Sequence, residues 1–138
     1  MYCFQQPVLF GKTVKDNLSF PYQIRNKEVD LVRLDSLLKI VDLPAECLNK
    51  EINSLSGGEK QRVALIRSIV FLPKVLLLDE VTTGLDGKSK EIVHRLIESV
   101  HRQGTTIVQV THDQSEIQVA KNVLEIKSRG LVNEKCNG

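Results

Sequence analysis

Apolar residues recur along this chain at two different spacings, and the two kinds of segment alternate. Spacing of three or four residues, which is typical of an amphipathic helix, occurs in Glu28–Val41, Gly57–Phe71 and Lys88–Gln103. Short aliphatic or β-branched runs, which are typical of strands, occur in Val75–Asp79 and Thr105–Val110. Strands that alternate with helices predict an α/β fold with a parallel sheet.

Other boundaries follow from turn-forming and capping residues. Met1–Phe4 resembles the end of a strand, because the polar turn Gln5–Pro7 follows it directly. Thr13 is positioned to cap a short helix, with Asp16 three residues later as its capping-box partner. We expect Pro21 to end this helix.

Within the apolar runs, burial can also be predicted. The unbroken run Val75–Leu78 predicts a strand that is buried on both faces. In Glu28–Val41, Leu31 belongs to the stripe that is expected to be buried. Towards the C-terminus we expect a short helix from about Gln114 to Lys121, a strand at Val123–Ile126, a turn at Ser128–Gly130 and a polar tail after Val132.

Composition excludes several classes of function. The 138 residues are 41% hydrophobic and 26% charged, with a net charge of +2, which is too balanced for nucleic acid or a membrane surface to be the main partner. Tryptophan is absent, so stacking platforms for single-stranded nucleic acid are not expected. No apolar run reaches the roughly 20 residues of a spanning helix. The three cysteines are widely spaced and indicate reduced thiols, so we expect a cytoplasmic protein. They are Cys3, Cys47 and Cys136.

The octapeptide Leu-Ser-Gly-Gly-Glu-Lys-Gln-Arg at Leu55–Arg62 is the most informative local feature. It places the Ser56 hydroxyl and the amides of Gly57 and Gly58 at the start of a helix, where backbone N–H groups and the helix dipole favour an anion. An ordinary glycine-rich helix start capped by Ser56 is the alternative.

A second chemical feature is the acidic pair that follows the run of aliphatic residues. Asp79 and Glu80 lie at the expected C-terminal end of a strand, where metal and phosphate chemistry is found in parallel α/β sheets. Two unrelated acids at a strand end are the alternative. The sequence Thr83-Gly84-Leu85-Asp86, which follows, makes that alternative weaker.

Taken together, these motifs resemble those of the ATP-binding cassette (ABC) ATPases. The resemblance covers Gln5 to His112 and extends loosely to Ile126. In family order, the matching elements are a Q-loop glutamine, the signature motif, the Walker B acids, the D-loop and the switch histidine. In this chain they are Gln5, Leu55–Arg62, Asp79 with Glu80, Thr83–Asp86 and His112. Residues 6–26 look most like those of the small bacterial ABC ATPases linked to iron export.

The resemblance implies a division of labour around ATP and Mg²⁺. Asp79 would hold Mg²⁺ through water, Gln5 would ligate the same ion, and Glu80 would be the general base that polarises the attacking water. His112 would contact the γ-phosphate. Taken alone, a turn glutamine and a lone histidine are more often structural, and only their places in the series favour these roles.

The signature motif has a different partner in this family. Ser56, Gly57 and Gly58 would bind the γ-phosphate of ATP held by the opposing subunit of a head-to-tail dimer. Asp86, in the D-loop, would lie at that dimer interface and contribute to the cofactor site. A plain turn is the alternative for the D-loop, because Gly84 suits one equally well.

One family element has no counterpart here, because no Gly-x-x-x-x-Gly-Lys-Ser/Thr phosphate loop (Walker A) occurs in the sequence. The expected fold is therefore a P-loop NTPase-type parallel sheet with flanking helices and a helical subdomain, without the N-terminal strands and the Walker A loop. We expect one partial ABC ATPase domain over residues 1–138. About 12–72 would form the helical subdomain, and 1–11 and 73–138 would belong to the α/β core.

The resulting functional hypothesis is an ATP-hydrolysing subunit of an ABC transporter. Its implied partners are a second ATPase subunit and a transmembrane permease, with no nucleic acid, at the inner face of the cell membrane. Without a phosphate loop, the chain alone is expected to be inactive. Two alternatives stay open: a catalytically dead module that donates its signature motif to a partner, and an ABC ATPase outside transport. Copurification with a permease, an intact ATPase or a nucleic acid complex would separate them.

Overall fold

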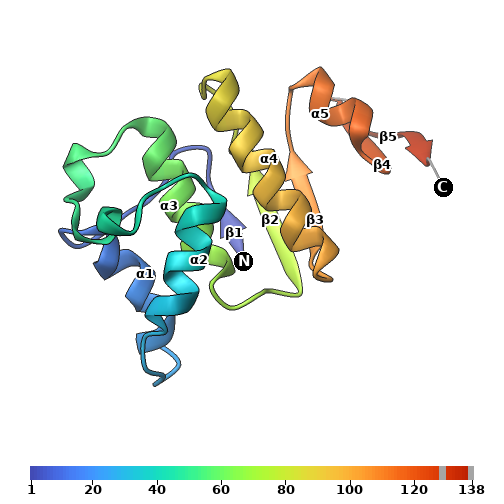
Figure 1. Ribbon diagram of the computed structural model, residues 1–138. Helices are drawn as coiled ribbons and strands as arrows, with labels where there is room; N and C mark the ends of the chain where they lie inside the picture. The colour runs from blue at the N-terminus through green and yellow to red at the C-terminus, as the bar shows by residue number, and fades with distance from the viewer. Residues whose placement is uncertain (128–129, 137–138) are drawn as a thin grey trace.

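Strands and helices alternate between residues 75 and 127, as the hydrophobic pattern predicts, whereas the segment between residues 14 and 69 is helical. The computed structural model describes residues 1–127 and 130–136, shown in Figure 1. Its strands are β1 (Tyr2–Cys3), β2 (Val75–Asp79), β3 (Thr106–Val110), β4 (Asn122–Lys127) and β5 (Gly130–Cys136). Its α-helices are α1 (Val14–Gln23), α2 (Leu31–Ile40), α3 (Gly57–Ile69), α4 (Gly87–Arg102) and α5 (Gln114–Val119), and two short 3₁₀ helices span Ala45–Asn49 and Ile52–Ser54.

A three-stranded parallel sheet lies at the centre of the fold. Its strand order is β1-β2-β3, with Tyr2 opposite Leu77 and Asp79 opposite Val110. Because all three strands run the same way, the residues that follow them emerge at one edge of the sheet. This edge is where the sequence places Gln5, Glu80 and His112.

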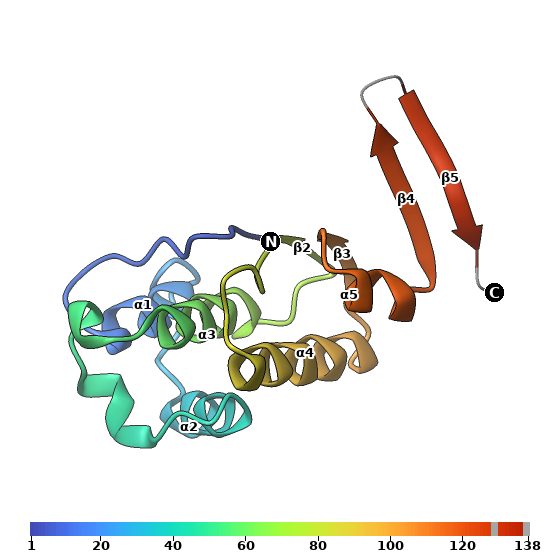
Figure 2. The ribbon, with the colours of Figure 1, turned by 90° about the horizontal axis from the view of Figure 1, so that it is seen from above.

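The two faces of the sheet are covered unequally. Figure 2 shows α3 and α4 on the same side of the sheet. Leu76 and Leu78 point to the covered side and are each 1% exposed, whereas Leu77, between them, is 37% exposed. The prediction that this strand is buried on both faces is therefore wrong for the described residues, since none of their helices covers the second face.

Helix α1 confirms one boundary signal and contradicts another. Thr13 and Asp16 form the expected capping box at its N-terminus. Pro21, however, lies inside the helix rather than at its end. The helix continues for only two residues beyond it, and Ile24 N–H still donates to Phe20 O (3.1 Å), so only one missing N–H has to be tolerated.

Helix α2 is shorter than its apolar pattern suggests. Asp30 caps it by accepting from the Arg33 N–H (2.9 Å), so the helix begins at Leu31 rather than Glu28. Leu34 and Leu38 are buried as expected, but Leu31 is 53% exposed. The residue in the first turn is therefore outside the buried stripe.

The C-terminal part adds an antiparallel pair of strands: β4, which matches the strand expected at Val123–Ile126, and β5, which the sequence does not predict. β5 occupies the segment in which a polar tail was expected after Val132. Strand pairing uses backbone groups, so a polar composition does not prevent it. A turn was expected at Ser128–Gly130, and two of its residues, Ser128 and Arg129, lie outside the described residues. Across residues 1–127 and 130–136, no helix combines the length and apolarity needed to cross a membrane.

Candidate functional site

Two of the candidate catalytic residues meet at the edge of the sheet. Glu80 follows β2, and its N–H donates to the carbonyl of Val110 in β3 (2.9 Å). This bond extends the pairing of β2 with β3 by one residue beyond Asp79. Glu80 Oε1 then lies 2.7 Å from Nε2 of His112, whose side chain is 90% exposed. The structure thus brings together an acid and a histidine that are 32 positions apart.

The backbone at Glu80 is unusual, with φ at 47°, in the left-handed region. A residue with a Cβ atom loses roughly 1–2 kcal/mol in this conformation. The surrounding contacts hold it there, since Glu80 N–H bonds Val110 and the Glu80 carbonyl accepts from Thr83 N–H (3.2 Å). Strain that is maintained in this way is commonly found where a side chain must point in a particular direction for function.

Asp79 is directed towards the other neighbouring strand. Its Oδ2 accepts a hydrogen bond from the hydroxyl of Tyr2 in β1 (2.6 Å). This bond, with the nearby carboxylate charge and partial burial, raises the pKa of Tyr2 above its usual value. Because β1 and β3 flank β2 on opposite sides, Asp79 and Glu80 make their contacts in opposite directions. Tyr2 was not singled out by its sequence.

Gln5 is exposed, and no hydrogen bond joins it to the other candidate residues of the described chain. The residue that anchors its segment is Gln61, which is 2% exposed in α3. Gln61 Nε2 donates to the carbonyls of Val81 (2.9 Å) and Phe4 (3.3 Å). It therefore ties the segment before Gln5 to the segment after Glu80. A polar residue four positions before buried Leu65 on the same helix face is the signal that could have identified it.

Helix α3 begins at Gly57, as the sequence predicts, and Ser56 caps it, which is the arrangement given as the alternative to anion binding. The Ser56 hydroxyl accepts from Glu59 N–H (3.1 Å), and the Glu59 carboxylate accepts from Ser56 N–H (3.1 Å). The bond from the Ser56 backbone is the main reason that the pKa of Glu59 lies below its usual value. Gly57 is exposed, and a Cβ added there would meet no atom within 4 Å. At Gly58 an added Cβ would lie 2.7 Å from Ser89 Oγ, so this glycine permits close packing of α3 on α4.

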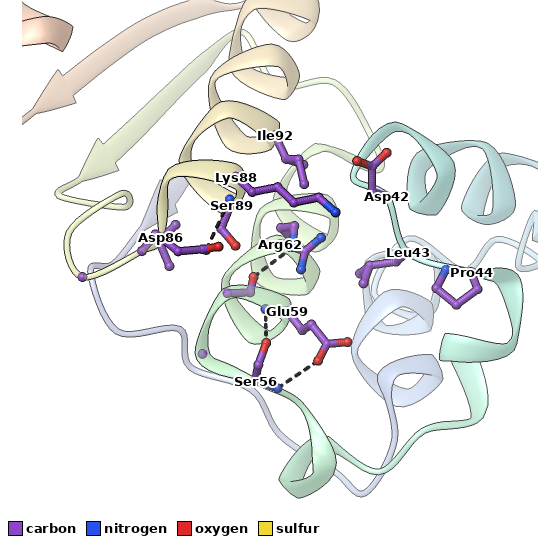
Figure 3. A pocket seen from close by; sticks show the side chains of 14 residues that line it. Asp42, Leu43, Pro44, Ser56, Glu59, Arg62, Asp86, Lys88, Ser89 and Ile92 are labelled. Carbon is purple, nitrogen blue, oxygen red and sulfur yellow. Dashed lines mark hydrogen bonds between the residues drawn. The ribbon is translucent and has the colours of Figure 1, made fainter.

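A pocket of about 640 Å³ opens beside this helix start. It is lined by the start of α3, the turn at residues 84–86, the start of α4 and residues 42–44 (Figure 3). Asp86 caps α4 by accepting from Ser89 N–H (3.3 Å), and the hydrogen bonds from Ser89 lower the pKa of Asp86. Arg62 and Lys88 contribute positive charge to the lining. The pocket therefore places two cationic side chains near a helix N-terminus, which favours an anion, and its lining also includes the carboxylates of Asp42, Glu59 and Asp86.

The candidate residues thus fall into two groups. Ser56, Gly57, Gly58 and Asp86 line the pocket, whereas Asp79, Glu80 and His112 are not among its lining residues. Asp79, Glu80 and His112 lie at the ends of β2 and β3 instead, and they form the strand-end group.

The strand-end group can be tested for its fit to Mg²⁺. In the described residues there is no group of three or more His, Cys, Asp or Glu side chains that could enclose a metal ion. Mg²⁺ does not need such an enclosure, because it is usually bound through one or two carboxylates together with substrate phosphates and water. The carboxylate of Asp79 and the amide oxygen of Gln5 are ligands of the right kind, so the donor chemistry fits a shared ion.

Comparison with known proteins places the chain among ABC transporter proteins. The family described as ABC transporter matches residues 1–83. The chain is 48% identical over 127 residues to the probable iron export ATP-binding protein FetA of Escherichia coli K12, covering 91% of this chain and 56% of that protein. It is 35% identical over 133 residues to the spermidine/putrescine import ATP-binding protein PotA of Borrelia garinii subsp. bavariensis, covering 94% and 38%.

A third relative is the cell division ATP-binding protein FtsE of Mycobacterium tuberculosis, which is 35% identical over 134 residues, 95% of this chain and 58% of that protein. The chain therefore spans between 38% and 58% of the length of these three proteins.

Proposed function

This chain belongs to the ABC transporter family, and on that premise we propose that it is part of an ATP-hydrolysing subunit that drives solute transport through a separate membrane subunit. The similarity to FetA favours a metal-ion exporter over the other transporter classes. The subunit would work as a head-to-tail dimer at the inner face of the cell membrane.

The contact between Glu80 and His112 is the observation that carries this proposal. As a general base, Glu80 needs a carboxylate that is fixed in direction and partly shielded from water, and its side chain is only 19% exposed. His112 Nε2 lies 2.7 Å from Glu80 Oε1, and this contact favours one direction of the carboxylate. Asp79 and Gln5 would hold Mg²⁺, which neutralises phosphate charge when it is bound. His112, being largely exposed, is free to contact the γ-phosphate as well.

The pocket beside α3 would serve the other half of the dimer. Ser56, Gly57 and Gly58 offer a hydroxyl and exposed backbone at a helix start, where the γ-phosphate of the partner's ATP would bind. Asp86 would contribute from the adjoining turn. The pocket residues are separate from the strand-end group, and this separation supports the idea that the two groups bind different nucleotides.

Two substitutions test the catalytic assignment in a form of the protein that carries a phosphate loop. Glu80→Gln should leave ATP binding largely intact and slow hydrolysis roughly 10²–10⁴-fold, because it removes the base without removing the metal ligand. Asp79→Asn should instead weaken Mg²⁺-dependent ATP binding. Hydrolysis by Glu80→Gln at the unmutated rate would show that the base is assigned wrongly.

A second function, donation of the signature motif to an intact ATPase, is favoured by one observation. The capping box at the start of α3 is formed by Ser56 and Glu59, so it needs no phosphate loop in its own chain. Mixed with an intact cassette that is trapped by a Glu-to-Gln change, this chain should pair in the presence of Mg-ATP. Ser56→Arg should abolish the pairing by placing bulk and charge where the γ-phosphate binds. Size-exclusion chromatography with and without Mg-ATP measures it, and pairing that survives Ser56→Arg would contradict this function.

A further inference from the structure

A buried carboxylate lies next to the strand-end group, and no step proposed above uses it. Glu116, in α5, is 7% exposed. Its Oε1 is 2.6 Å from both Thr82 Oγ1 and His94 Nε2. Its Oε2 accepts from Gln109 Nε2 (2.9 Å) and from the Thr111 hydroxyl. These four partners come from the turn after β2, from α4, from β3 and from the end of β3, so one side chain joins four parts of the fold.

Two of these partners flank the proposed catalytic residues. Thr82 is two residues after Glu80, and Thr111 directly precedes His112. The Thr111 hydroxyl also accepts from Asp113 N–H (3.0 Å), so it fixes the backbone on both sides of His112. Glu116 therefore bridges the segment that carries the base and the segment that carries the histidine.

His112 depends on this backbone more than most side chains do. Within the described residues, its ring makes one polar contact, with Glu80, and the side chain is 90% exposed. Packing therefore does not fix its direction. The position of its Cα and Cβ atoms has to come from residues 111 and 113, which Thr111 and a 2.6 Å ion pair between Asp113 and Lys90 hold in place.

The network is arranged to keep Glu116 ionised. Burial by itself would raise the pKa of this carboxyl, but the hydrogen bonds from Thr111, Thr82 and His94 together bring it below its usual value. A buried carboxylate accepts hydrogen bonds that are stronger than those of a neutral amide. Replacing its charge would weaken the contacts to Thr82 and Thr111 at the same time.

We propose that Glu116 is a positioning residue that holds the Glu80 and His112 segments together and so keeps their side chains in contact. The inference rests on the proposed function, because it is that function which gives the contact a catalytic purpose. The alternative role is purely structural, in which Glu116 only stabilises the packing of α5. The two roles differ in what happens to the ring of His112 when the fold is kept.

Nuclear magnetic resonance of the histidine rings in this 138-residue chain provides a test without nucleotide. Because Glu80 Oε1 lies 2.7 Å from His112 Nε2, the resonance of this ring nitrogen reports the contact between the two side chains. We expect Glu116→Gln, which keeps the side-chain volume, to move the His112 Nε2 resonance towards its position in Glu80→Gln. His101, which contacts the Thr105 carbonyl (3.0 Å), should be unchanged and serves as the internal reference. Glu80→Gln provides the positive control, because it removes the carboxylate itself.

A matched pair of threonine variants separates positioning from general stability. Thr111→Val removes one hydroxyl of the network at the end of β3. Thr105→Val removes the hydroxyl that bonds the Pro73 carbonyl (2.8 Å), next to the other end of the same strand. Both should lower the melting temperature, but only Thr111→Val should change the His112 ring. This comparison still decides the question if Glu116→Gln fails to fold.

Catalysis supplies a second readout in a form that carries a phosphate loop. Glu116→Gln should lower kcat roughly tenfold and leave KM for ATP within about twofold, because it misplaces the base without touching the nucleotide. His112 signals unchanged in both Glu116→Gln and Thr111→Val, or changed equally by Thr105→Val, would overturn the positioning role. That result leaves the catalytic assignment standing, since the latter fails only if Glu80→Gln hydrolyses ATP normally.

Discussion

At the start of α3, the bonds of the capping box come from residues three positions apart, whereas at the ends of β2 and β3 the contacts come from distant parts of the chain. Ser56 and Glu59 form this capping box by themselves. The second needs Glu80 and His112 to meet, and Glu116 bridges the segments on either side of them. The first region can therefore form with its helix, whereas the second exists only once the sheet has assembled.

The two regions are nevertheless joined at one residue. Gln61 belongs to α3 but donates to the carbonyls of Phe4 and Val81, on the strand side. The helix that begins at the proposed signature motif therefore also supports the segments around Gln5 and Glu80. Changes to this contact, and to each region separately, would measure how independent the two regions are.

The largest effect is expected beneath the strand-end region, in β2. Leu76→Ala should cost about 2–5 kcal/mol of unfolding free energy, because this side chain is 1% exposed and its removal leaves a cavity. Leu77→Ala, one residue later on the uncovered face, should cost at most about half as much. Urea denaturation of both variants measures the difference. Equal losses would show that the second face of β2 is covered in solution, in line with the expectation from the sequence.

Breaking the link at Gln61 should have the next largest effect. Gln61→Leu leaves the carbonyls of Val81 and Phe4 without their donor, which costs about 1–3 kcal/mol when the groups are buried. The control is Gln103→Leu, at the exposed end of α4, which should stay within about 0.5 kcal/mol of the unmutated chain. If Gln61→Leu is as mild as its control, then the two regions are not coupled through this residue.

The same contrast explains what could be predicted from the sequence. The capping boxes at Thr13 and Ser56 were predictable because both partners lie within three residues, where geometry is fixed by the helix itself. The buried faces of α3 and α4 followed from their periodicity. Pro21 and Leu77 were misjudged because each depends on what surrounds the element: how far a helix continues, and whether a second layer covers a strand.

Of the candidate site, the sequence motifs indicate which residues matter but not what holds them in place. The Glu80–His112 contact follows from adjacent parallel strands, so the motif order already predicts the two to be near each other. Tyr2 and Glu116 do not belong to any local pattern of charge or spacing, and the position of Gln61 on the buried face of α3 indicates its burial but not its partners. Tyr2 bonds Asp79, 77 positions away, Gln61 bonds Val81, 20 positions away, and Glu116 bonds Thr82, 34 positions away. Only the folded chain shows these contacts.

A smaller effect is expected from the cap of α3. Ser56→Ala should cost about 1 kcal/mol, the usual value for loss of an N-cap hydroxyl, without changing the His112 ring. Thr13→Ala removes the equivalent cap of α1 and should cost a similar amount. Denaturation and histidine spectra of both variants measure the outcome. A changed His112 spectrum in Ser56→Ala alone would mean that the helix start and the strand ends are coupled more tightly than the contacts suggest.

The smallest expected effect is a dependence on pH at the same helix start. The pKa of Glu59 in the folded chain lies below its ordinary value of 4.5, chiefly because its carboxylate accepts from Ser56 N–H. The stabilisation that this carboxylate provides is therefore complete above pH 4.5 and is lost as the pH falls through the lower, folded value. Urea midpoints of the unmutated chain and of Glu59→Gln should thus differ at pH 7 and converge near the acid end. Because both proteins contain all the other carboxylates, the change with pH in the difference between their urea midpoints reports on Glu59 alone. A difference that stays constant with pH would show that the charge of Glu59 does not stabilise the start of α3.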